Sequence, residues 1–187
     1  MSTEKEKVQK GELYDANYDS ELQGEMLATR CRLFEFNSMP PGKIAERESI
    51  LRSILNIGSN FCILSPFHCD YGSNITIGNN FFANVNLVIL DGAKVVIGDN
   101  VFIAPNVGIY TAGHPLDVEL RRKGLEYALP IEIGNDVWIG GGVSILPGVR
   151  IGDGSVIGAG SVVNRDIPAH VVAAGNPCKV IKKLSDE

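Results

Sequence analysis

The stretch IGDGSVIGAGSVV, residues 151–163, decides the fold predicted for this chain of 187 residues. Isoleucine or valine returns at every sixth position, as Ile151, Ile157 and Val163, and a serine stands four places after each of the first two. Six is a multiple of the two-residue repeat of a β-strand, so these side chains fall on one face of an extended chain, whereas the 3.6-residue repeat of a helix would scatter them. The stretch therefore predicts short strands rather than a helix.

The six-residue spacing continues through much of the chain. It is unbroken over residues 133–163, and an earlier block with the same phase covers residues 97–109. A further block, residues 77–89, is two residues out of phase with the second, which predicts a small insertion near residues 92–95. Repetition at a short fixed period is typical of a solenoid.

A single long strand could not bury an inward row of aliphatic side chains, but three short strands can form a triangular coil of about 18 residues. Such coils would stack about 4.8 Å apart through ladder hydrogen bonds. Glycine followed by Asn or Asp, as at Gly78-Asn79 and Gly152-Asp153, suits corners that need permissive dihedral angles. An ordinary β-sandwich is the alternative, but sandwiches seldom keep a six-residue phase over so many units.

Both ends of the chain depart from the repeat, as the ends of a solenoid must if its strand edges are to be covered. Ser20 with Gln23 predicts a capping box that opens a helix, and Pro41 can start a second helix. The prediction is a mainly β protein in three parts: a helical cap at residues 1–57, a β-helix at 58–170 and a C-terminal tail at 171–187.

Composition narrows the classes of partner and compartment. The net charge of −5, with no basic block, argues against nucleic-acid binding. The first ten residues are polar and charged, and no segment is apolar over a length that could cross a bilayer, so neither a signal peptide nor a membrane association is expected. The four cysteines form no CxxC pair, which fits a reducing, cytoplasmic setting.

The repeat breaks once, after Ile109, and returns at Ile131, which predicts one long inserted loop at residues 111–130. Long loops on a rigid scaffold commonly carry function. His114 stands where this loop begins, and imidazole is the side chain best suited to take a proton from an alcohol near neutral pH. A histidine with a purely structural role at the root of the loop is the other interpretation.

Several motifs together resemble the hexapeptide-repeat sugar O-acetyltransferases, most closely the maltose acetyltransferases and also the galactoside and nodulation acetyltransferases. They are FFANVNLVILDG (81–92), IGDNVFIAPNVGIYTAGHP (97–115), IGNDVWIGGGVSILPGVRIGD (133–153), IGAGSVV (157–163) and AAGNPCKVIKK (173–183), with the opening MSTEKEKVQKGELYDAN. The resemblance implies a left-handed parallel β-helix, assembled as a homotrimer. The handedness comes from the resemblance alone, because crossover connections are otherwise right-handed in about 98% of cases.

The activity implied by the resemblance is transfer of acetyl from the co-substrate acetyl-CoA to a hydroxyl of a sugar of the maltose or glucose type. His114 would act as general base, and the hydroxyl would attack the thioester directly in a ternary complex. Asn84 matches the family's motif asparagine and would donate to the developing oxyanion. An asparagine that serves only a corner or a ladder is an equal alternative for Asn84.

Asp70 and Asp91 are expected to bind the acceptor, since carboxylates accept hydrogen bonds strongly from hydroxyl groups. Asn17, with Asp15 and Asp19 as alternatives, could reach the sugar from the helical cap. The competing interpretation of Asp70 and Asp91 is that they are buried turn carboxylates. Asp70 replaces a serine of the galactoside-type members, and Gly92 stands where those members carry a second acid. Both differences favour a maltose-type acceptor.

Glu126, inside the loop, could orient His114 by a hydrogen bond to the ring nitrogen that does not act as base, as the third member of a catalytic triad does. An exposed loop glutamate with no such role is the other interpretation.

The coenzyme needs a slot for its pantetheine arm and cations for its phosphates. Trp138 offers an apolar flank, and a contact with a trimer partner is the other interpretation of this residue. For Lys179 and Lys182 the alternative is a basic tail that is merely solvated. The residues that match cofactor-lining positions of the family are Trp138, Gly141, Ala159, Asn164, Arg165, Lys179 and Lys182.

Two rival functions use the same fold. A zinc hydratase would need a set of three histidines, whereas His68, His114 and His170 are widely spaced, and no metal is expected. A noncatalytic trimeric scaffold would keep the prism without the chemistry. An acetyltransferase for another glycoside or for a non-sugar alcohol is the remaining alternative.

Overall fold

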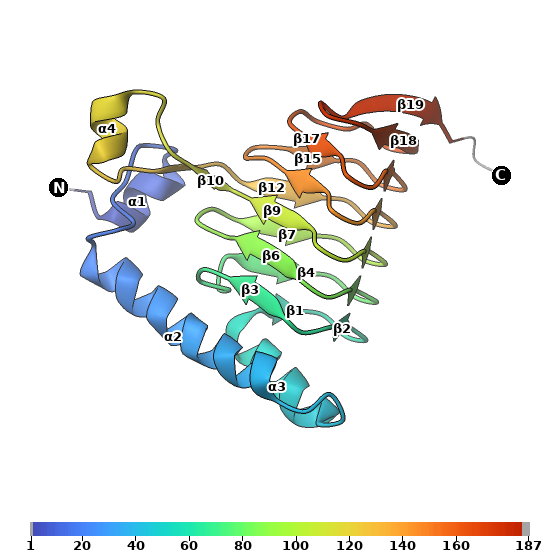
Figure 1. Ribbon diagram of the computed structural model, residues 1–187, viewed down its shortest axis with the longest axis horizontal. Helices are drawn as coiled ribbons and strands as arrows, with labels where there is room; N and C mark the ends of the chain where they lie inside the picture. The colour runs from blue at the N-terminus through green and yellow to red at the C-terminus, as the bar shows by residue number, and fades with distance from the viewer. Residues whose placement is uncertain (1, 185–187) are drawn as a thin grey trace.

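Three sheets, parallel except for the last strand of the second, close into a three-sided β-helix in the computed structural model, which describes residues 2–184 (Figure 1). The first sheet holds β1 (Asn56–Ile57), β4 (Ile75–Ile77), β7 (Val95–Ile97), β12 (Ile131–Ile133) and β15 (Arg150–Ile151) in that order. The second holds β2 (Cys62–Ile63), β5 (Phe82–Ala83), β8 (Phe102–Ile103), β13 (Trp138–Ile139), β16 (Val156–Ile157), β18 (Val171–Ala174) and β19 (Lys179–Lys183). The third holds β3 (Phe67–Cys69), β6 (Leu87–Leu90), β9 (Gly108–Tyr110), β14 (Ser144–Ile145) and β17 (Val162–Val163).

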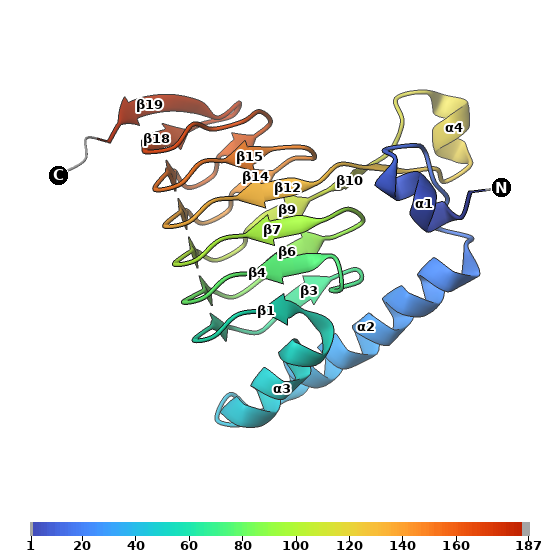
Figure 2. The ribbon, with the colours of Figure 1, turned by 180° about the vertical axis from the view of Figure 1, so that it is seen from behind.

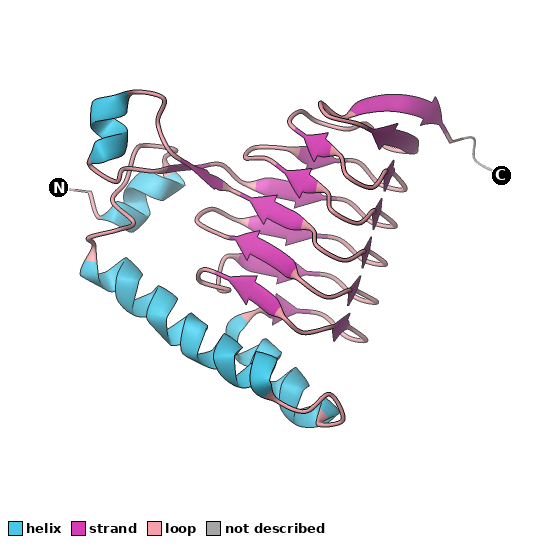
Figure 3. Cartoon of the chain, in the orientation of Figure 1, coloured by secondary structure: helices cyan, strands magenta, loops and turns pink. Residues whose placement is uncertain are grey.

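Helices occur in the N-terminal cap and in the inserted loop (Figure 3). They are α1 (Glu4–Gln9), α2 (Ser20–Ser38), α3 (Ile44–Ile54) and, in the loop, α4 (Val118–Arg122). The loop also contains a two-stranded antiparallel ribbon of β10 (Ala112–Gly113) and β11 (Tyr127–Ala128). No helix within residues 2–184 is long and apolar enough to cross a membrane.

The lead residues of the repeat point into the prism, as predicted. Strands such as β4, β6 and β7 alternate buried and more exposed positions, and Ile89, Ile109, Ile139 and Ile157 are fully buried. Equivalent leads pair in register between coils, so aliphatic side chains stack in columns along the axis. The predicted parallel β-helix is confirmed.

The coils differ in length. Ile77 pairs with Ile97, 20 residues later, whereas Ile133 pairs with Ile151, only 18 residues later. The insertion predicted near residues 92–95 lies between β6 and β7, and an insertion that was not predicted lies between β3 and β4. The 111–130 loop follows β9, so all three insertions occur at the corner where the third sheet passes to the first.

The glycines that follow lead residues are required for coil stacking rather than for unusual dihedral angles. A Cβ added to Gly78 would lie 2.7 Å from the carbonyl group of Gly98, and one added to Gly98 would lie 2.8 Å from that of Gly134. The positive φ angles fall two residues later, at Asn80 (55°) and Asn100 (58°). The corner positions of these glycines were predicted correctly, but the reason given was wrong. A side chain is excluded by the small distance between successive backbones and not by the dihedral angles of the glycine.

Side-chain oxygens join successive coils at the same corner. Asn79 Oδ1 accepts a hydrogen bond from the Ser59 N–H at 3.0 Å, and Asp99 Oδ1 accepts one from the Asn79 N–H at 2.6 Å. Asn135 Oδ1 continues the column by accepting from the Asp99 N–H at 2.9 Å. Each Asn or Asp thereby satisfies a backbone donor that the sheet ladder leaves free.

The cap covers one end of the prism, with α2 and α3 side by side below the first coil (Figures 1 and 2). Asp19, not the predicted Ser20, is the N-cap of α2, and its Oδ1 accepts from the Leu22 N–H at 2.9 Å. Gln23 is used differently from the predicted capping box, because its amide donates to the Ala16 carbonyl at 2.6 Å. Asp is as good an N-cap as Ser, and the choice between neighbours depends on where the chain turns into the helix.

The second predicted helix begins later than expected, and two short helices, α1 in the cap and α4 in the loop, were missed. α3 starts at Ile44 rather than at Pro41, and α1 opens with a capping box formed by Thr3 and Glu6. At the other end, the residues predicted as a tail form β18, which extends the second sheet, and β19, which turns back antiparallel to it.

A pair of glycine substitutions tests the stacking argument. We expect Gly98→Ala to lower the free energy of unfolding by about 2 kcal/mol or more, because the new methyl group overlaps a backbone that cannot move away. Gly24→Ala, in the second turn of α2 with nothing within 4 Å of the added Cβ, should instead stabilise by about 0.5–1 kcal/mol. Chemical denaturation of the two variants measures both values, and equal stability of Gly98→Ala and the parent would contradict the argument.

Candidate active site

His114 lies just after β10, at the start of the inserted loop, with its side chain half-exposed. Its Nδ1 lies 3.0 Å from the carbonyl oxygen of Leu125 on the returning arm of the loop. A carbonyl can only accept a hydrogen bond, so neutral His114 carries its proton on Nδ1 and leaves a lone pair on Nε2. The ring is therefore held in the form that can accept a proton at Nε2.

Glu126 lies on the opposite side of the ring from the place predicted for it. Its Oε1 is 4.0 Å from His114 Nε2, the nitrogen that can act as base, while the Leu125 carbonyl occupies the orienting position at Nδ1. Glu126 Oε2 accepts a hydrogen bond from the Tyr14 hydroxyl at 3.2 Å. The triad-like role predicted for Glu126 is corrected, because the backbone carbonyl already fills that role.

A cavity of about 480 Å³ opens beside these groups, between the cap and the corner that carries the insertions. It brings together four of the predicted residues, His114, Glu126, Asp70 and Asn17. Sequence reasoning missed other residues of its wall, because nothing in their own spacing distinguishes them from helix or core positions; they include Tyr14, Gln23, Arg30, Tyr71 and Gly113.

Asp70 gives this cavity a carboxyl group that titrates near neutral pH. Burial raises the pKa of Asp70 to about 6, the charges of Asp91 and Glu126 act in the same direction, and the Arg30 guanidinium lowers the pKa. At pH 7 the carboxyl is mostly ionised and can accept hydrogen bonds from hydroxyl groups. Asn17 lies at the cavity's cap side, with its amide donating to the Gly124 carbonyl at 2.6 Å.

Asp91 does not line the cavity. Its side chain is fully buried, and Oδ1 accepts hydrogen bonds from the N–H groups of Asp70 and Tyr71, both at 2.9 Å. Its Oδ2 has no hydrogen-bond partner among residues 2–184, and burial raises the pKa of its carboxyl. The acceptor-binding role predicted for Asp91 is corrected: it is the buried turn carboxylate, and it shapes the backbone that presents Asp70.

Asn84 lies at a different corner, between β5 and β6, and does not line the His114 cavity of its own chain. Its N–H donates to the Ile103 carbonyl at 2.9 Å, and its Oδ1 accepts from the Val85 N–H at 2.8 Å. The side-chain amide nitrogen keeps both of its hydrogens for another acceptor, since none of the described hydrogen bonds uses them.

The residues predicted for the cofactor lie away from the His114 cavity, along the prism toward its C-terminal end. Trp138 projects outward from β13 with 56% of its surface exposed, and its in-register neighbour Phe102 is 54% exposed. Gly141 lies at the corner after β13, and Ala159 lies at the equivalent corner of the next coil, after β16. The remaining predicted positions are all exposed, after β17 or on β19; they are Asn164, Arg165, Lys179 and Lys182.

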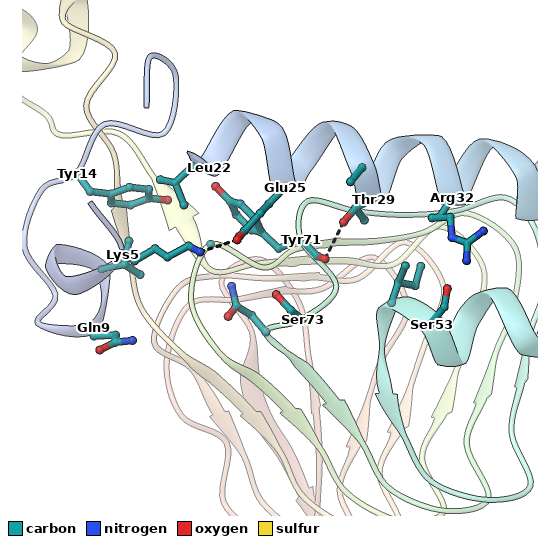
Figure 4. A pocket seen from close by; sticks show the side chains of 15 residues that line it. Lys5, Gln9, Tyr14, Leu22, Glu25, Thr29, Arg32, Ser53, Tyr71 and Ser73 are labelled. Carbon is teal, nitrogen blue, oxygen red and sulfur yellow. Dashed lines mark hydrogen bonds and ion pairs between the residues drawn. The ribbon is translucent and has the colours of Figure 1, made fainter. Parts of the chain in front are cut away.

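A second cavity, of about 550 Å³, lies between α1, α2 and the first coil, and contains none of the predicted residues (Figure 4). Tyr14, Tyr71 and Gly92 belong to both cavities and lie between them. Its side chains are largely engaged with one another: Lys5 pairs with Glu25, and the Thr29 hydroxyl donates to the Tyr71 carbonyl at 2.8 Å. Within residues 2–184, no group of three or more His, Cys, Asp or Glu could hold a metal ion.

Comparison with known proteins gives two family matches that agree with this architecture. Residues 130–165 match the bacterial transferase hexapeptide family (six repeats), and residues 7–57 match the maltose acetyltransferase hexapeptide capping motif. The second match coincides with the helical cap, and the first with β12 to β17.

Proteins that are similar over nearly the whole chain are also acetyltransferases by name. A putative acetyltransferase of Saccharomyces cerevisiae is 63% identical over 97% of this chain and 93% of its own length. A solved galactoside acetyltransferase in complex with coenzyme A superposes with a TM-score of 0.96 at 46% identity, covering 100% of this chain and 93% of that one. A maltose O-acetyltransferase from Clostridium difficile 630 superposes with a TM-score of 0.93 at 49% identity, covering 99% of both chains. The chain thus belongs to the hexapeptide-repeat sugar O-acetyltransferases, an acetyl-CoA-dependent family that includes the maltose and galactoside enzymes.

Proposed function

We propose that this chain acetylates a hydroxyl of a sugar of the maltose or glucose type, with His114 as general base. The observation that carries the proposal is the hydrogen bond of His114 Nδ1 to the Leu125 carbonyl, which leaves the Nε2 lone pair beside a polar cavity. Asp70 and Asn17 supply an acceptor and an amide for sugar hydroxyls on the same cavity.

The reaction needs one proton acceptor and no covalent enzyme intermediate. Nε2 takes the proton of the sugar hydroxyl while its oxygen attacks the thioester carbonyl of acetyl-CoA. The tetrahedral intermediate expels the coenzyme thiolate. The thiolate then takes the proton from the His114 imidazolium, which gives the acetyl ester and free coenzyme. Glu126, 4.0 Å from Nε2, favours the transient imidazolium by its charge.

The surface near the C-terminal end of the prism fits acetyl-CoA. Exposed Trp138 offers an apolar flank for the pantetheine arm, and Arg165, Lys179 and Lys182 offer cations for phosphates on an otherwise acidic chain. We assign these residues, with Gly141, Ala159 and Asn164, to the coenzyme.

We further propose that the chain is a homotrimer whose sites lie between subunits. Asn84 is separate from the His114 cavity of its own chain, so an oxyanion donor at that position acts on the site of a neighbouring chain. A single flat face of the prism does not enclose both a thioester and a sugar.

Replacement of the base tests the first proposal. We expect His114→Ala to lower kcat by about a thousandfold, in the range that general base catalysis contributes, with trimer size and coenzyme affinity unchanged. Release of free thiol, measured with a panel of glucose, maltose, other glycosides and simple alcohols, gives the rates and the preferred acceptor. His170→Asn is the matched control, because Asn tolerates the positive φ of 56° at that position. Unchanged turnover of His114→Ala would refute the base assignment.

The raised pKa of Asp70 gives a pH prediction. As the pH falls through about 6 the carboxyl becomes protonated and accepts sugar hydroxyls less well, so the KM for the acceptor should rise about tenfold between pH 7 and 5. In Asp70→Asn the KM should be high throughout and lose this inflection, while the KM for acetyl-CoA follows the same course in both enzymes. An inflection that survives in Asp70→Asn would assign it to another group.

Mixed trimers test the location of the site. Neither His114→Ala nor Asn84→Ala should turn over acceptor alone at an appreciable rate, but co-expression should restore about a quarter of the parent activity, because one interface in each mixed trimer pairs an intact His114 with an intact Asn84. Separately purified proteins that are combined without subunit exchange serve as the control. Absence of complementation in verified mixed trimers would place both residues in one subunit's site.

A further inference from the structure

Tyr14 joins the helical cap to the returning arm of the inserted loop. The Tyr14 N–H donates to the Glu126 carbonyl and the Glu126 N–H donates to the Tyr14 carbonyl, both at 3.0 Å, in an isolated antiparallel bridge. Asn17, three residues later, donates its side-chain amide to the Gly124 carbonyl at 2.6 Å. The cap thus holds the residues on both sides of Leu125, whose carbonyl fixes Nδ1 of His114.

The Tyr14 side chain makes a second connection, directed at the carboxylate of Glu126. Its hydroxyl donates to Oε2 at 3.2 Å, while the other oxygen, Oε1, lies 4.0 Å from His114 Nε2. One carboxylate oxygen is therefore anchored by the phenol, and the other faces the nitrogen that exchanges the proton. A hydrogen bond to a charged acceptor is worth more than one between neutral groups.

The phenol has little freedom to move. Tyr14 is 1% exposed and packs in a small core with Leu22, Met26 and Tyr71, separate from the core of the prism. A Cβ added to Gly92 would lie 2.8 Å from the Tyr14 hydroxyl oxygen, so the glycine leaves only enough room for that oxygen. Burial and the charge of Glu126 raise the pKa of Tyr14, so its hydroxyl keeps its proton and can donate near neutral pH.

We propose that Tyr14 is a positioning residue for catalysis: its hydroxyl holds the Glu126 carboxylate where it stabilises the His114 imidazolium formed during acetyl transfer. The proposal rests on the proposed function of His114. The cap thereby contributes to catalysis, because the hydroxyl that holds the carboxylate comes from a segment outside the β-helix. Gly92 is part of the same arrangement, since any larger side chain at that position would displace the Tyr14 hydroxyl.

Tyr14→Phe removes the hydroxyl and keeps the ring. We expect kcat for acetyl transfer to fall about tenfold, the effect of losing one hydrogen bond to a charged group, while the KM for acetyl-CoA stays within about twofold. Tyr18→Phe is the matched control, because Tyr18 lies in the same segment with 78% of its surface exposed and should leave kcat unchanged. An unchanged kcat in Tyr14→Phe would overturn the proposal.

A double-mutant cycle separates positioning from a structural contribution. Glu126→Met removes both carboxylate oxygens at similar side-chain length, and in that background Tyr14→Phe should change kcat by less than about twofold. It should also leave Tm unchanged or higher, since the hydroxyl has lost its acceptor. Fully additive losses of kcat would show that Tyr14 does not act through Glu126, and would overturn the proposal.

Gly92→Ala supplies a test that changes neither partner. The added methyl group displaces the Tyr14 hydroxyl, so kcat should fall in the parent chain and change little in the Tyr14→Phe background. An equal fall in both backgrounds would overturn the proposal. The parent and His114→Ala are assayed in the same experiment. A parent without acetyl transfer, or a fully active His114→Ala, disproves the proposed function itself. An active parent in which the losses of kcat are additive disproves only the role of Tyr14.

Discussion

The distance between successive coils, about 4.8 Å, is the constraint on which the rest of this structure depends. It leaves no room for a Cβ after several lead residues, as the approach of Gly78 to Gly98 shows, and it places side-chain oxygens such as Asp99 Oδ1 within reach of the next backbone N–H. Within the prism no residue can be added, because an added residue would reverse every later side chain between core and solvent. Extra residues are accommodated at corners.

The candidate site follows from where those corners lie. The chain lengthens only between the third and first sheets, after β3, after β6 and after β9, and these three positions supply Asp70, Asp91 with Gly92, and His114. Stacking places them one above another along a single edge, although they are about 20 residues apart in sequence. Asp91 shows how closely the neighbours depend on one another, since its buried carboxylate holds the turn that presents Asp70.

The sequence predicted those features that depend on spacing. Lead residues such as Ile109 and Ile157 were expected inside and are buried, and the break after Ile109 was expected to carry His114. Errors arose where a residue's role depends on which groups it meets in the folded chain. Asp91 was interpreted by its charge, whereas its partners are backbone groups of the preceding coil, and Glu126 was expected at the nitrogen that the Leu125 carbonyl occupies.

Handedness could not be obtained from the residues at all, because the six-residue repeat fits either hand and only the family resemblance distinguished them. Tyr14 was missed for a related reason: a single tyrosine in a polar N-terminal segment has no pattern of its own, and its partner is 112 residues away. That separation also affects biosynthesis. A ribosome makes Tyr14 early, yet the Tyr14 hydroxyl has no acceptor until the inserted loop that carries Glu126 has been translated. The arrangement of His114 and Glu126 is therefore completed only late in synthesis, when a residue near the start of the chain bridges to one made 112 residues later.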